Sequence, residues 1–521
     1  MAVMAVQAQT WLDYDQALSA WTWLRTSNAA ALSTYQPGDS TQRLLADGWV
    51  AMSTAQGHLA PLQESPRAWQ ASAGVRSVFR ASDRVVLRGG MDYRNRWGSD
   101  AGGSVWLNPD EMPFDITEYT DSTRGRIRWE QYRLQGEVGV KVLKFLDMGA
   151  SFAYTTASGA KQKDPRHTNS IMRLETSVGT TAHWNRFRLG VNYVLRRFTE
   201  AVQFRTYGRT DRIYHYLIDN GAFYGRDEQT DGKGYVSSDN EKPLLDMRHG
   251  LALQRGYEQG AWSVVAQWQW LHRHGHYGLE SPSQVDFNQH RGDQWQASAW
   301  LQHATPSSIY RLELGWQHEN VKDYERTYRI ITDGGVTDIV YYDNRLMGRR
   351  QEIHYHAGAT AQWGIRRQLA TWQLDADVDH HRRQVTAIMY PYYREQTAHL
   401  TTATLRGTRN WITRRDHVWT LACQGLWATG DGEAYRDATY GTPSDGTPKP
   451  RQHETYLMRQ YEWLTAQRVG VGAALRWSMP VLQQRMRVYV NLSCQLQWGL
   501  NVKWLEDNHR HEASIALGTL F

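Results

Sequence analysis

The chain has 521 residues and a formal net charge of +6, with 24 Trp and 28 Tyr against only 10 Phe. Mean hydropathy is −0.65, and no run of about 18 apolar residues occurs, which excludes a membrane-spanning helix. No basic run or nucleic-acid motif accompanies the positive charge, so binding to DNA or RNA is not predicted. The composition permits a transmembrane β-barrel, because half of each barrel strand and all of each long loop are polar, and Trp and Tyr favour membrane–water interfaces.

Residues 1–8 are interpreted as the end of a signal peptide. Val6, Gln7 and Ala8 precede Gln9, and small residues of this kind stand near signal-peptide cleavage points. A basic region and a full apolar core do not come before them, which indicates a start codon assigned too late. The alternative is an irregular soluble N-terminus.

Residues 9–42 do not alternate, and we predict an N-terminal segment that is periplasmic or plugs the barrel lumen. Trp11, Tyr14, Leu18 and Trp21 recur at spacings of three and four, which predicts a short amphipathic helix.

The stretch SNAAAL, from Ser27 to Leu32, follows this predicted helix. It loosely resembles the Asn-Pro-Ala-Gly-Leu stretch near the start of the long-chain fatty-acid transporter barrels, although the Pro and the Gly are absent here. In those barrels the N-terminus plugs the lumen, so the resemblance implies a plug with Asn28 and Leu32 as candidate residues.

Residues 43–521 are predicted to form the barrel, because apolar and polar residues alternate there with the period of two that is typical of strands. Tyr132 and Leu134, for example, alternate with Arg133 and Gln135. We predict about 18 strands, near 43–57, 66–80, 84–97, 125–143, 146–158, 169–182, 186–201, 243–257, 260–274, 291–304, 308–323, 345–364, 367–384, 395–410, 415–429, 464–479, 483–498 and 508–521.

The connections between these segments alternate in length. Short connections are predicted near 81–83, 144–145, 183–185, 258–259, 305–307, 365–366, 411–414 and 480–482. Longer polar ones are predicted near 98–124, 159–168, 202–242, 275–290, 324–344, 385–394, 430–463 and 499–507. Short periplasmic turns and long extracellular loops are typical of transmembrane barrels, so both termini are predicted to be periplasmic. The alternative, a soluble propeller, should show a motif repeating every 40–50 residues or so, and none is found.

The last eleven residues of the final predicted strand, His511 to Phe521, alternate strictly, with Ile515 and Leu517 on one side and Ser514 and Ala516 on the other. A strand that ends in this way resembles the closing strand of Gram-negative outer-membrane β-barrels. That resemblance implies a terminal aromatic, Phe521, that belongs to the assembly signal. It also implies the barrel assembly machinery, outer-membrane lipid and lipopolysaccharide as partners. The predicted fold is therefore an all-β, transmembrane, antiparallel up-and-down barrel with a short N-terminal helical or plug segment.

The polar, lumen-facing sides of the predicted strands carry both charges. The basic residues are Arg76, Arg88, Arg94, Arg188 and Arg196. A charged ladder is predicted on the hairpin near 345–384, formed by Glu352, His354, His356, Asp375, Asp377 and Asp379. A two-residue turn at Ile365 and Arg366 would set the register of this hairpin. The resulting pairs are His356 with Asp375, His354 with Asp377 and Glu352 with Asp379.

Three interpretations of this ladder stay open. The first is mutual pairing of lumen groups, the second is a metal site of His and carboxylate ligands, and the third is a pH-sensitive gate. A second cluster, His272, His274 and His276, shares one side if its strand continues. This cluster is a candidate site for a metal or a haem-like ligand at the cell surface, and the alternative is solvated loop residues.

The sequence contains no Gly-x-Ser-x-Gly, His-Glu-x-x-His or phosphate-loop motif, so no enzyme activity and no cofactor are predicted. The predicted role is passage or uptake of a solute, as a channel or as an accessory barrel of an uptake complex with a receptor. The alternative is a scaffold for a secretion or surface-lipoprotein assembly. The large loops near 202–242 and 430–463 are candidates to fold inward and close the lumen.

Overall fold

The computed structural model describes residues 14–19, 21–36, 43–207, 212–230, 236, 242–281, 284–333, 336–367, 369–482 and 485–521. The expected signal-peptide remnant, residues 1–8, lies outside these ranges. Within them, no helix combines the length and the apolar character needed to span a membrane.

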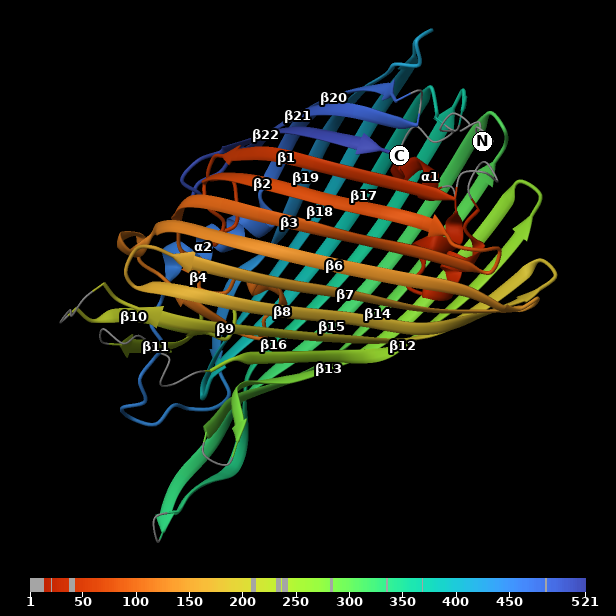
Figure 1. Cartoon of the computed structure of the whole chain (residues 1–521). Coiled ribbons are helices and arrows are strands. Elements are labelled where there is room, and N and C mark those ends of the chain that lie inside the picture. Colours follow the sequence, from red (N-terminus) through yellow and green to blue (C-terminus); the bar gives the residue numbers. More distant parts are fainter. Residues whose placement is uncertain are drawn as a thin grey trace.

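Eighteen strands form one closed antiparallel sheet in which consecutive strands pair and the last strand pairs with the first. The closing pair joins β22 to β1, and the backbone N–H of Phe521 donates to the Ala46 carbonyl at 2.9 Å. The predicted up-and-down barrel is confirmed (Figure 1). Its strands are β1 (Leu44–Gln56), β2 (Arg67–Arg80), β3 (Val85–Ala101), β6 (Gly125–Leu143), β7 (Leu146–Lys161), β8 (Arg166–Trp184), β9 (Phe187–Arg205), β12 (Leu244–Gln259), β13 (Trp262–Ser281), β14 (Gln284–Ala304), β15 (Ser308–Asp333), β16 (Val336–Trp363), β17 (Trp372–Met389), β18 (Tyr392–Ile412), β19 (Val418–Thr439), β20 (Gln467–Val481), β21 (Met486–Leu500) and β22 (His509–Leu520).

The exterior of the barrel is apolar, and the interior is polar. On β12, Leu251 and Leu253 are 46% and 50% exposed, whereas Gln254 on the opposite face is 3% exposed. The same alternation recurs on β22, where Ile515 and Leu517 face outward. A closed sheet with apolar residues outside and polar residues inside is the arrangement of outer-membrane β-barrels, which confirms the predicted likeness at the level of fold.

The two ends of the barrel differ. One end, called here the short-turn end, carries the short connections together with the N-terminal helical segment and the C-terminus (Figure 1). The long-loop end carries the small elements β4 (Gly103–Ser104), η3 (Pro109–Glu111), β5 (Asp115–Glu118), η4 (Asp121–Thr123), β10 (Tyr214–Asp219), β11 (Gly225–Thr230) and α2 (Glu454–Thr465). Four of these elements form a second sheet in the order β11-β10-β5-β4.

Three of the predicted loops are largely strand instead. Residues 275–290, 324–344 and 385–394 are mostly extensions of β13–β14, β15–β16 and β17–β18. The alternation weakens there because water replaces lipid on the outer face, while the backbone ladder still satisfies its hydrogen bonds. The β15–β16 hairpin, green in Figure 1, projects well beyond its neighbours.

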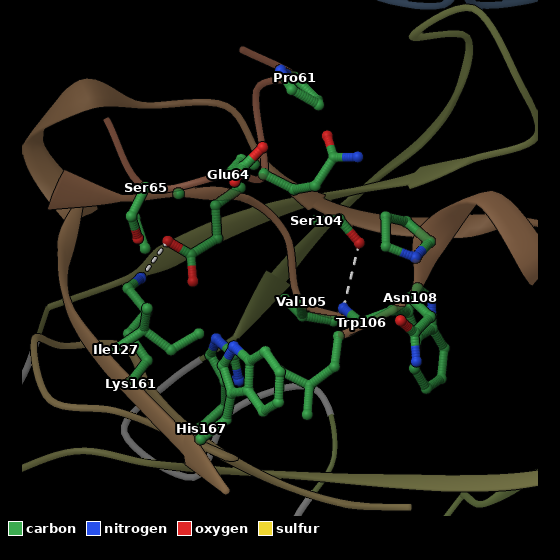
Figure 2. A pocket seen from close by; sticks show the side chains of 18 of the residues that line it. Pro61, Glu64, Ser65, Ser104, Val105, Trp106, Asn108, Ile127, Lys161 and His167 are labelled. Atoms are coloured by element: carbon green, nitrogen blue, oxygen red, sulfur yellow. Dashed lines mark hydrogen bonds and ion pairs between the residues drawn. The ribbon is translucent and has the colours of Figure 1, made fainter. Parts of the chain in front are cut away.

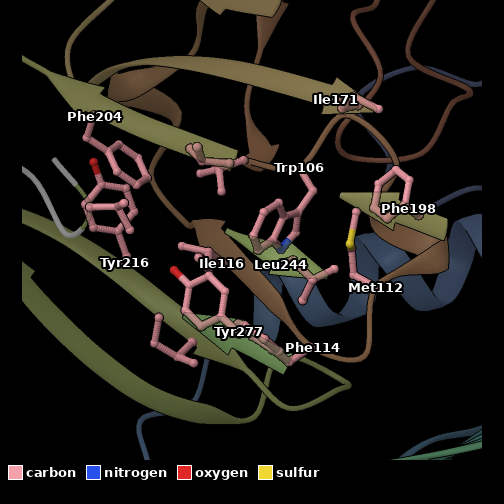
Figure 3. Close-up of a cluster of buried hydrophobic side chains, with 14 of the residues drawn as sticks. Trp106, Met112, Phe114, Ile116, Ile171, Phe198, Phe204, Tyr216, Leu244 and Tyr277 are labelled. Atoms are coloured by element: carbon pink, nitrogen blue, oxygen red, sulfur yellow. The ribbon is translucent and has the colours of Figure 1, made fainter. Parts of the chain in front are cut away.

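A hydrophobic core holds the loops against the barrel wall at the long-loop end. Trp106, Met112 and Phe114 from the 102–124 connection pack with Phe198 and Tyr277 of the wall (Figure 3). The rings of Phe114 and Tyr277 lie 5.1 Å apart in an edge-on arrangement. These contacts anchor the small sheet inside the mouth of the barrel.

The small sheet contains two carboxyl groups that face each other across the β5–β10 ladder, Asp115 and Asp219. Removal from solvent raises the pKa of Asp115 to about 7, and the Asp219 charge adds to the effect, although Ser104 and the backbone N–H of Ile116 donate to Asp115. A carboxyl group whose pKa is raised by folding costs stability as it ionises.

We therefore expect the small sheet to lose stability as the pH rises from about 4 to about 7. Asp115→Asn should weaken this dependence and protect β10 and β5 at pH 8. Hydrogen exchange of residues 214–230 at pH 5 and pH 8 measures it. The control is Asp445→Asn, which changes an exposed carboxylate in another loop. Equal protection factors at both pH values in the unmodified chain, after correction for the intrinsic pH dependence of amide exchange, would contradict the expectation.

Candidate functional site

The N-terminal segment lies inside the barrel at the short-turn end. It consists of α1 (Tyr14–Ser19), η1 (Thr22–Arg25) and η2 (Ala29–Thr34). It contacts strands on several sides of the lumen, with η2 against β3, β6, β7 and β8, η1 against β13 and α1 against β1. A segment that touches so many strands of a closed sheet occupies its interior.

A row of three glycines seats η2 against the wall. Gly139, Gly149 and Gly179 are cross-strand neighbours on β6, β7 and β8. A Cβ atom on Gly149 would lie 2.3 Å from the Ala29 carbonyl carbon, and one on Gly139 would lie 2.4 Å from the Ser33 nitrogen. Glycine is therefore required here because two backbones approach each other.

Asn28 joins η2 to the wall with both ends of its amide. Its Oδ1 accepts from the backbone N–H of Ala30 at 3.0 Å, which caps η2. Its Nδ2 donates to the Thr180 carbonyl and to Gln254 Oε1, each at 3.0 Å. Buried hydrogen bonds of this kind are costly to break, because the polar groups left behind are cut off from water.

Leu32 is fully buried in an apolar cluster with wall residues that include Val86 and Leu520. Charged contacts add to this packing, since Arg25 pairs with Glu313 of β15 at 2.7 Å. Ser33 donates to Asp147 of β7 at 2.6 Å. The segment is thus bound to the wall by apolar, polar and charged contacts together.

At the long-loop end, the connections fold into the lumen and bind its wall. Glu111 of η3 pairs with Arg173 of β8 at 2.7 Å. Arg350 of β16 donates to the Met112 carbonyl at 2.9 Å. Lys161 of β7 forms a buried ion pair with Glu118 of β5. Both lumen ends are therefore occupied by parts of the chain.

Two cavities lie between these end segments and share part of their lining. One, of about 490 Å³, is bounded by the N-terminal segment through Tyr14 and Ser27. The other, of about 280 Å³, lies under η3 and is bounded by Asp110 and Arg248. Glu175 and Arg196 line both. A third cavity, of about 380 Å³, lies among the outer loops beside Trp106, Lys161 and His167 (Figure 2).

Arg196 of β9 and Glu175 of β8 are cross-strand partners at the junction of the two cavities. Within the described residues, neither side chain forms an ion pair, and the Nε atom of Arg196 is buried with no hydrogen-bond partner. By contrast, Arg248 nearby pairs with Asp246 at 3.0 Å. A half-buried guanidinium that forms no ion pair is suited to bind an anionic group of a solute.

The other predicted basic residues also face the lumen, but each pairs with a carboxylate. Arg76 pairs with Asp15 of α1 at 2.8 Å and with Asp47 at 2.9 Å. The remaining pairs are Arg88 with Glu137, Arg94 with Asp92 and Arg188 with Glu258. Among the five residues predicted from the sequence, Arg196 therefore stands apart.

The six residues of the predicted charged ladder face the lumen in a register that differs from the predicted one. His356 lies opposite Asp379 instead of Asp375, and Glu352 lies opposite Arg383. The expected two-residue turn is wrong, because β16 ends at Trp363 and β17 begins at Trp372. A longer connection moves the pairing by four residues and keeps the same faces inward.

In the observed register, Asp379 accepts hydrogen bonds from two imidazoles. His354 Nε2 lies 3.0 Å and His356 Nδ1 lies 2.9 Å from the same carboxylate oxygen. Asp377 is 4.0 Å from His356, and Asp375 accepts from Thr360 at 2.9 Å. Across the described ranges, no group of three or more His, Cys, Asp or Glu side chains is placed to hold one metal ion.

The second histidine cluster lies on the exterior, because β13 continues to Ser281. The rings of His272 and His274 stack at 5.7 Å, and His249 of β12 lies beside both. His272 also contacts Asp293 at 3.2 Å. His276 follows on the same side of the strand, outside the lumen.

Sequence reasoning did not single out Glu175 or the three seat glycines. The alternation placed Glu175 on a polar face, but only the closed barrel brings it to the cavities. The glycines had a detectable signal: Gly139, Gly149 and Gly179 all fall on polar faces of predicted strands, where a glycine often marks close approach of another backbone.

A family model matches residues 41–521, which include the whole barrel, and it is described as a family of unknown function, DUF6850. The chain belongs to this family. No curated protein sequence matches the DUF6850 chain.

Among solved structures, the DUF6850 chain is similar to the outer membrane transporter YddB from Escherichia coli, with 6% identity, coverage of 92% of this chain and 81% of that one, and a TM-score of 0.41. It is also similar to BauA, the ferric preacinetobactin receptor from Acinetobacter baumannii, with 7% identity, coverage of 90% and 80%, and a TM-score of 0.36. The toluene transporter TodX from Pseudomonas putida matches with 10% identity, coverage of 95% and 92%, and a TM-score of 0.28. Similarity at this level says nothing about what the DUF6850 chain binds.

Proposed function

We propose that the barrel takes up a small polar solute with an anionic group across the outer membrane, and that the N-terminal segment gates its inner end. In this proposal the short-turn end and both termini are periplasmic, and the long loops face the outside. The observation that supports it most is Arg196, which lines two lumen cavities and, among the described residues, forms no ion pair. No catalytic role is proposed for any residue.

A solute would enter past the loops and meet Arg196 together with Glu175. Its anionic group would bind the guanidinium, and a donor on the solute would suit the carboxylate. Release into the periplasm would then require the N-terminal segment to move, because its residues Tyr14 and Ser27 line the 490 Å³ cavity.

Arg196→Gln is expected to raise the concentration of anionic solute that gives half-maximal flux about tenfold to a hundredfold. The reason is that a hydrogen bond to a charged group contributes roughly 1.5–3 kcal/mol. This change is measured as the flux of gluconate and of uncharged galactose into proteoliposomes. The Arg196→Gln substitution is tested both in the intact chain and in the chain with residues 14–36 deleted. Galactose flux should not change.

The control for this substitution is Arg406→Gln, which removes the same charge from β18, away from both cavities. If both variants lower gluconate flux equally, the effect comes from the total lumen charge and Arg196 is not a binding residue.

A scaffold function is the second candidate, and the β15–β16 hairpin favours it. Ile330, Ile331, Val340 and Tyr342 are 54%, 44%, 42% and 65% exposed on this projecting hairpin. Exposed apolar side chains of this kind suit contact with a partner protein. Absence of any solute flux, with or without residues 14–36, would favour the scaffold over uptake.

A further inference from the structure

The 380 Å³ cavity among the outer loops, called here the mouth cavity, lies between the inner wall of the barrel and the inward-folded connections (Figure 2). Residues between 101 and 111 cover it, and residues between 61 and 65 close one side. The wall residues are Arg96 of β3, Trp129 of β6, Lys161 of β7 and His167 of β8. Small-molecule sites usually measure roughly 300–1,000 Å³, so the mouth cavity is large enough for one small ligand.

The connection that covers the mouth cavity is held in place by hydrogen bonds to the barrel wall. The Val105 carbonyl accepts from Nδ2 of Asn169 at 2.8 Å, and the backbone N–H of Leu107 donates to Glu200 at 2.9 Å. Trp106, between these two loop residues, is buried in the hydrophobic core at the long-loop end. A site whose walls are already ordered binds a ligand at a lower cost in conformational entropy, so the mouth cavity is preformed for binding.

One side of the mouth cavity is aromatic. Trp129 lies three residues before Tyr132, which is exposed to lipid, so the indole of Trp129 is on the lumen side of β6. It is half-buried and lines the cavity together with Ile127. An accessible indole presents a flat face with a negative quadrupole. Such a face is suited to contact the C–H groups on one side of a cyclic ligand.

Three polar side chains of the lining are accessible to a ligand. Gln63 is half-buried, and Asn108 and Asp110 are exposed. In the part of the chain that the structure describes, none of these three side chains forms a hydrogen bond or an ion pair. An amide group both donates and accepts hydrogen bonds, and a carboxylate accepts them. The three groups therefore match a ligand with several hydroxyl groups, each of which also donates and accepts.

The basic side chains of the lining are neutralised by carboxylates. Arg96 pairs with Glu64 at 2.5 Å, and Lys161 forms its buried pair with Glu118. The side chains of Arg96 and Glu64 are 24% and 28% exposed, so a ligand can still reach them. Two adjacent hydroxyl groups suit such a pair, because they can accept from the guanidinium and donate to the carboxylate. The mouth cavity therefore favours a neutral, polyhydroxylated group over an anion.

The mouth cavity adjoins the lumen cavities described above. Asp110 and Glu111 of η3 line both the mouth cavity and the 280 Å³ cavity. Both carboxylate oxygens of Glu111 accept from Arg173 of β8 at 2.7 Å, which fixes η3 between the two spaces. A ligand in the mouth cavity would therefore be one short helical turn away from the interior of the barrel.

We propose that the mouth cavity binds a pyranose sugar, with one face of the ring against Trp129 and the hydroxyl groups on the polar side chains of the lining. A pyranose combines an apolar C–H face with a rim of adjacent hydroxyl groups, and each part matches one part of this cavity. An open-chain polyol has no such face, and an anion finds no unpaired cation here among the described residues. The proposal concerns binding at the mouth and does not depend on solute uptake.

Saturation-transfer NMR titration of the methyl pyranosides of galactose, glucose and mannose against the full-length barrel in detergent tests this proposal. At least one of them should bind saturably. Gln63→Ala/Asn108→Ala should weaken that binding about fourfold to a hundredfold, since each hydrogen bond contributes about twofold to tenfold. Trp129→Ala should weaken it at least about tenfold, because the ring loses its apolar contact. The control Trp49→Ala, which removes a half-buried indole from the lumen face of β1, should bind the sugar normally.

A second ligand, 2-(hydroxymethyl)tetrahydropyran, keeps the ring but has no adjacent hydroxyl groups, and it should bind the intact chain much more weakly than the sugar. Equal binding of this ligand would overturn the proposal, because the cavity would then not recognise the hydroxyl groups. No saturable binding of any of the three pyranosides would overturn it, and so would unchanged affinity in either cavity variant or an equal loss in Trp49→Ala. The titration involves neither transport nor Arg196, so failure of this proposal and failure of the uptake proposal are distinguishable.

Discussion

Replacing Gly149 with leucine is expected to displace the N-terminal segment from the lumen and to raise the ion conductance of the barrel in a planar bilayer. A Cβ atom at this position would lie 2.3 Å from the Ala29 carbonyl carbon and from the Ala30 nitrogen. Overpacking a core costs about 1–3 kcal/mol when side chains can adjust. Two backbones cannot adjust in this way, so the free-energy cost of the clash is larger. Moving the short N-terminal segment breaks fewer contacts than breaking the β7 ladder, so we expect the segment to move.

The matched control is Gly425→Leu on β19, where an added Cβ meets nothing within 4 Å. Both variants gain the same side chain, but only Gly149→Leu disturbs the seat of η2. The folded barrel is verified in each case by its mobility on an unheated gel. Conductance that stays at the level of the intact chain in Gly149→Leu would show that the segment does not block the lumen.

Deletion of residues 14–36 extends the same measurement. Current in the deletion variant and in Gly149→Leu, with little in the intact chain, would show that the segment closes the inner end. Steady current in all three would indicate a diffusion pore. No current in any of them would locate the obstruction in the inward-folded loops.

Lys161→Met is expected to release the 102–124 connection from the barrel mouth. The side chains of Lys161 and Glu118 are 2% and 3% exposed, and removing one partner of a buried ion pair typically costs 3–5 kcal/mol or so, because the other charge stays buried alone. Hydrogen exchange of β5 amides should accelerate roughly a hundredfold to a few thousandfold, because the free energy of local opening falls by that amount.

The double variant Lys161→Met/Glu118→Leu tests this reason, because it removes both charges and should restore much of the protection. An exposed pair serves as the control: Arg436 and Glu395 are 62% and 26% exposed, and Arg436→Met should change nothing measurable. Equal exchange in the single and double variants would contradict an electrostatic origin of the effect.

The predicted strand positions agree closely with the structure near the ends of the chain. The first strand was expected at 43–57 and is Leu44–Gln56, and the last was expected at 508–521 and is His509–Leu520. Agreement was worse for β15 and β16, which run far past their predicted limits. Alternation reports a difference between lipid and lumen, and it fades where both faces of a hairpin meet water.

The same distinction between local and long-range information applies to the candidate site. Alternation is a local property, so the sequence by itself determined that Arg196, Asp379 and the other charged residues face the lumen. Whether such a residue has a partner depends on strands and loops distant in sequence. Only the tertiary structure therefore decided that Arg88 pairs with Glu137, whereas Arg196 lines two cavities and forms no ion pair in the described part of the chain.

The sequence by itself determined the barrel, its strand number and the face that each strand turns to the lipid, because a period-two pattern needs only neighbours along the chain. Only the tertiary structure decided the four-residue shift of the β16–β17 register and the seat of Asn28 against β8 and β12. Each of these depends on the lengths of connections and on which rows of a tilted, closed sheet stand side by side, and no local pattern encodes that closure.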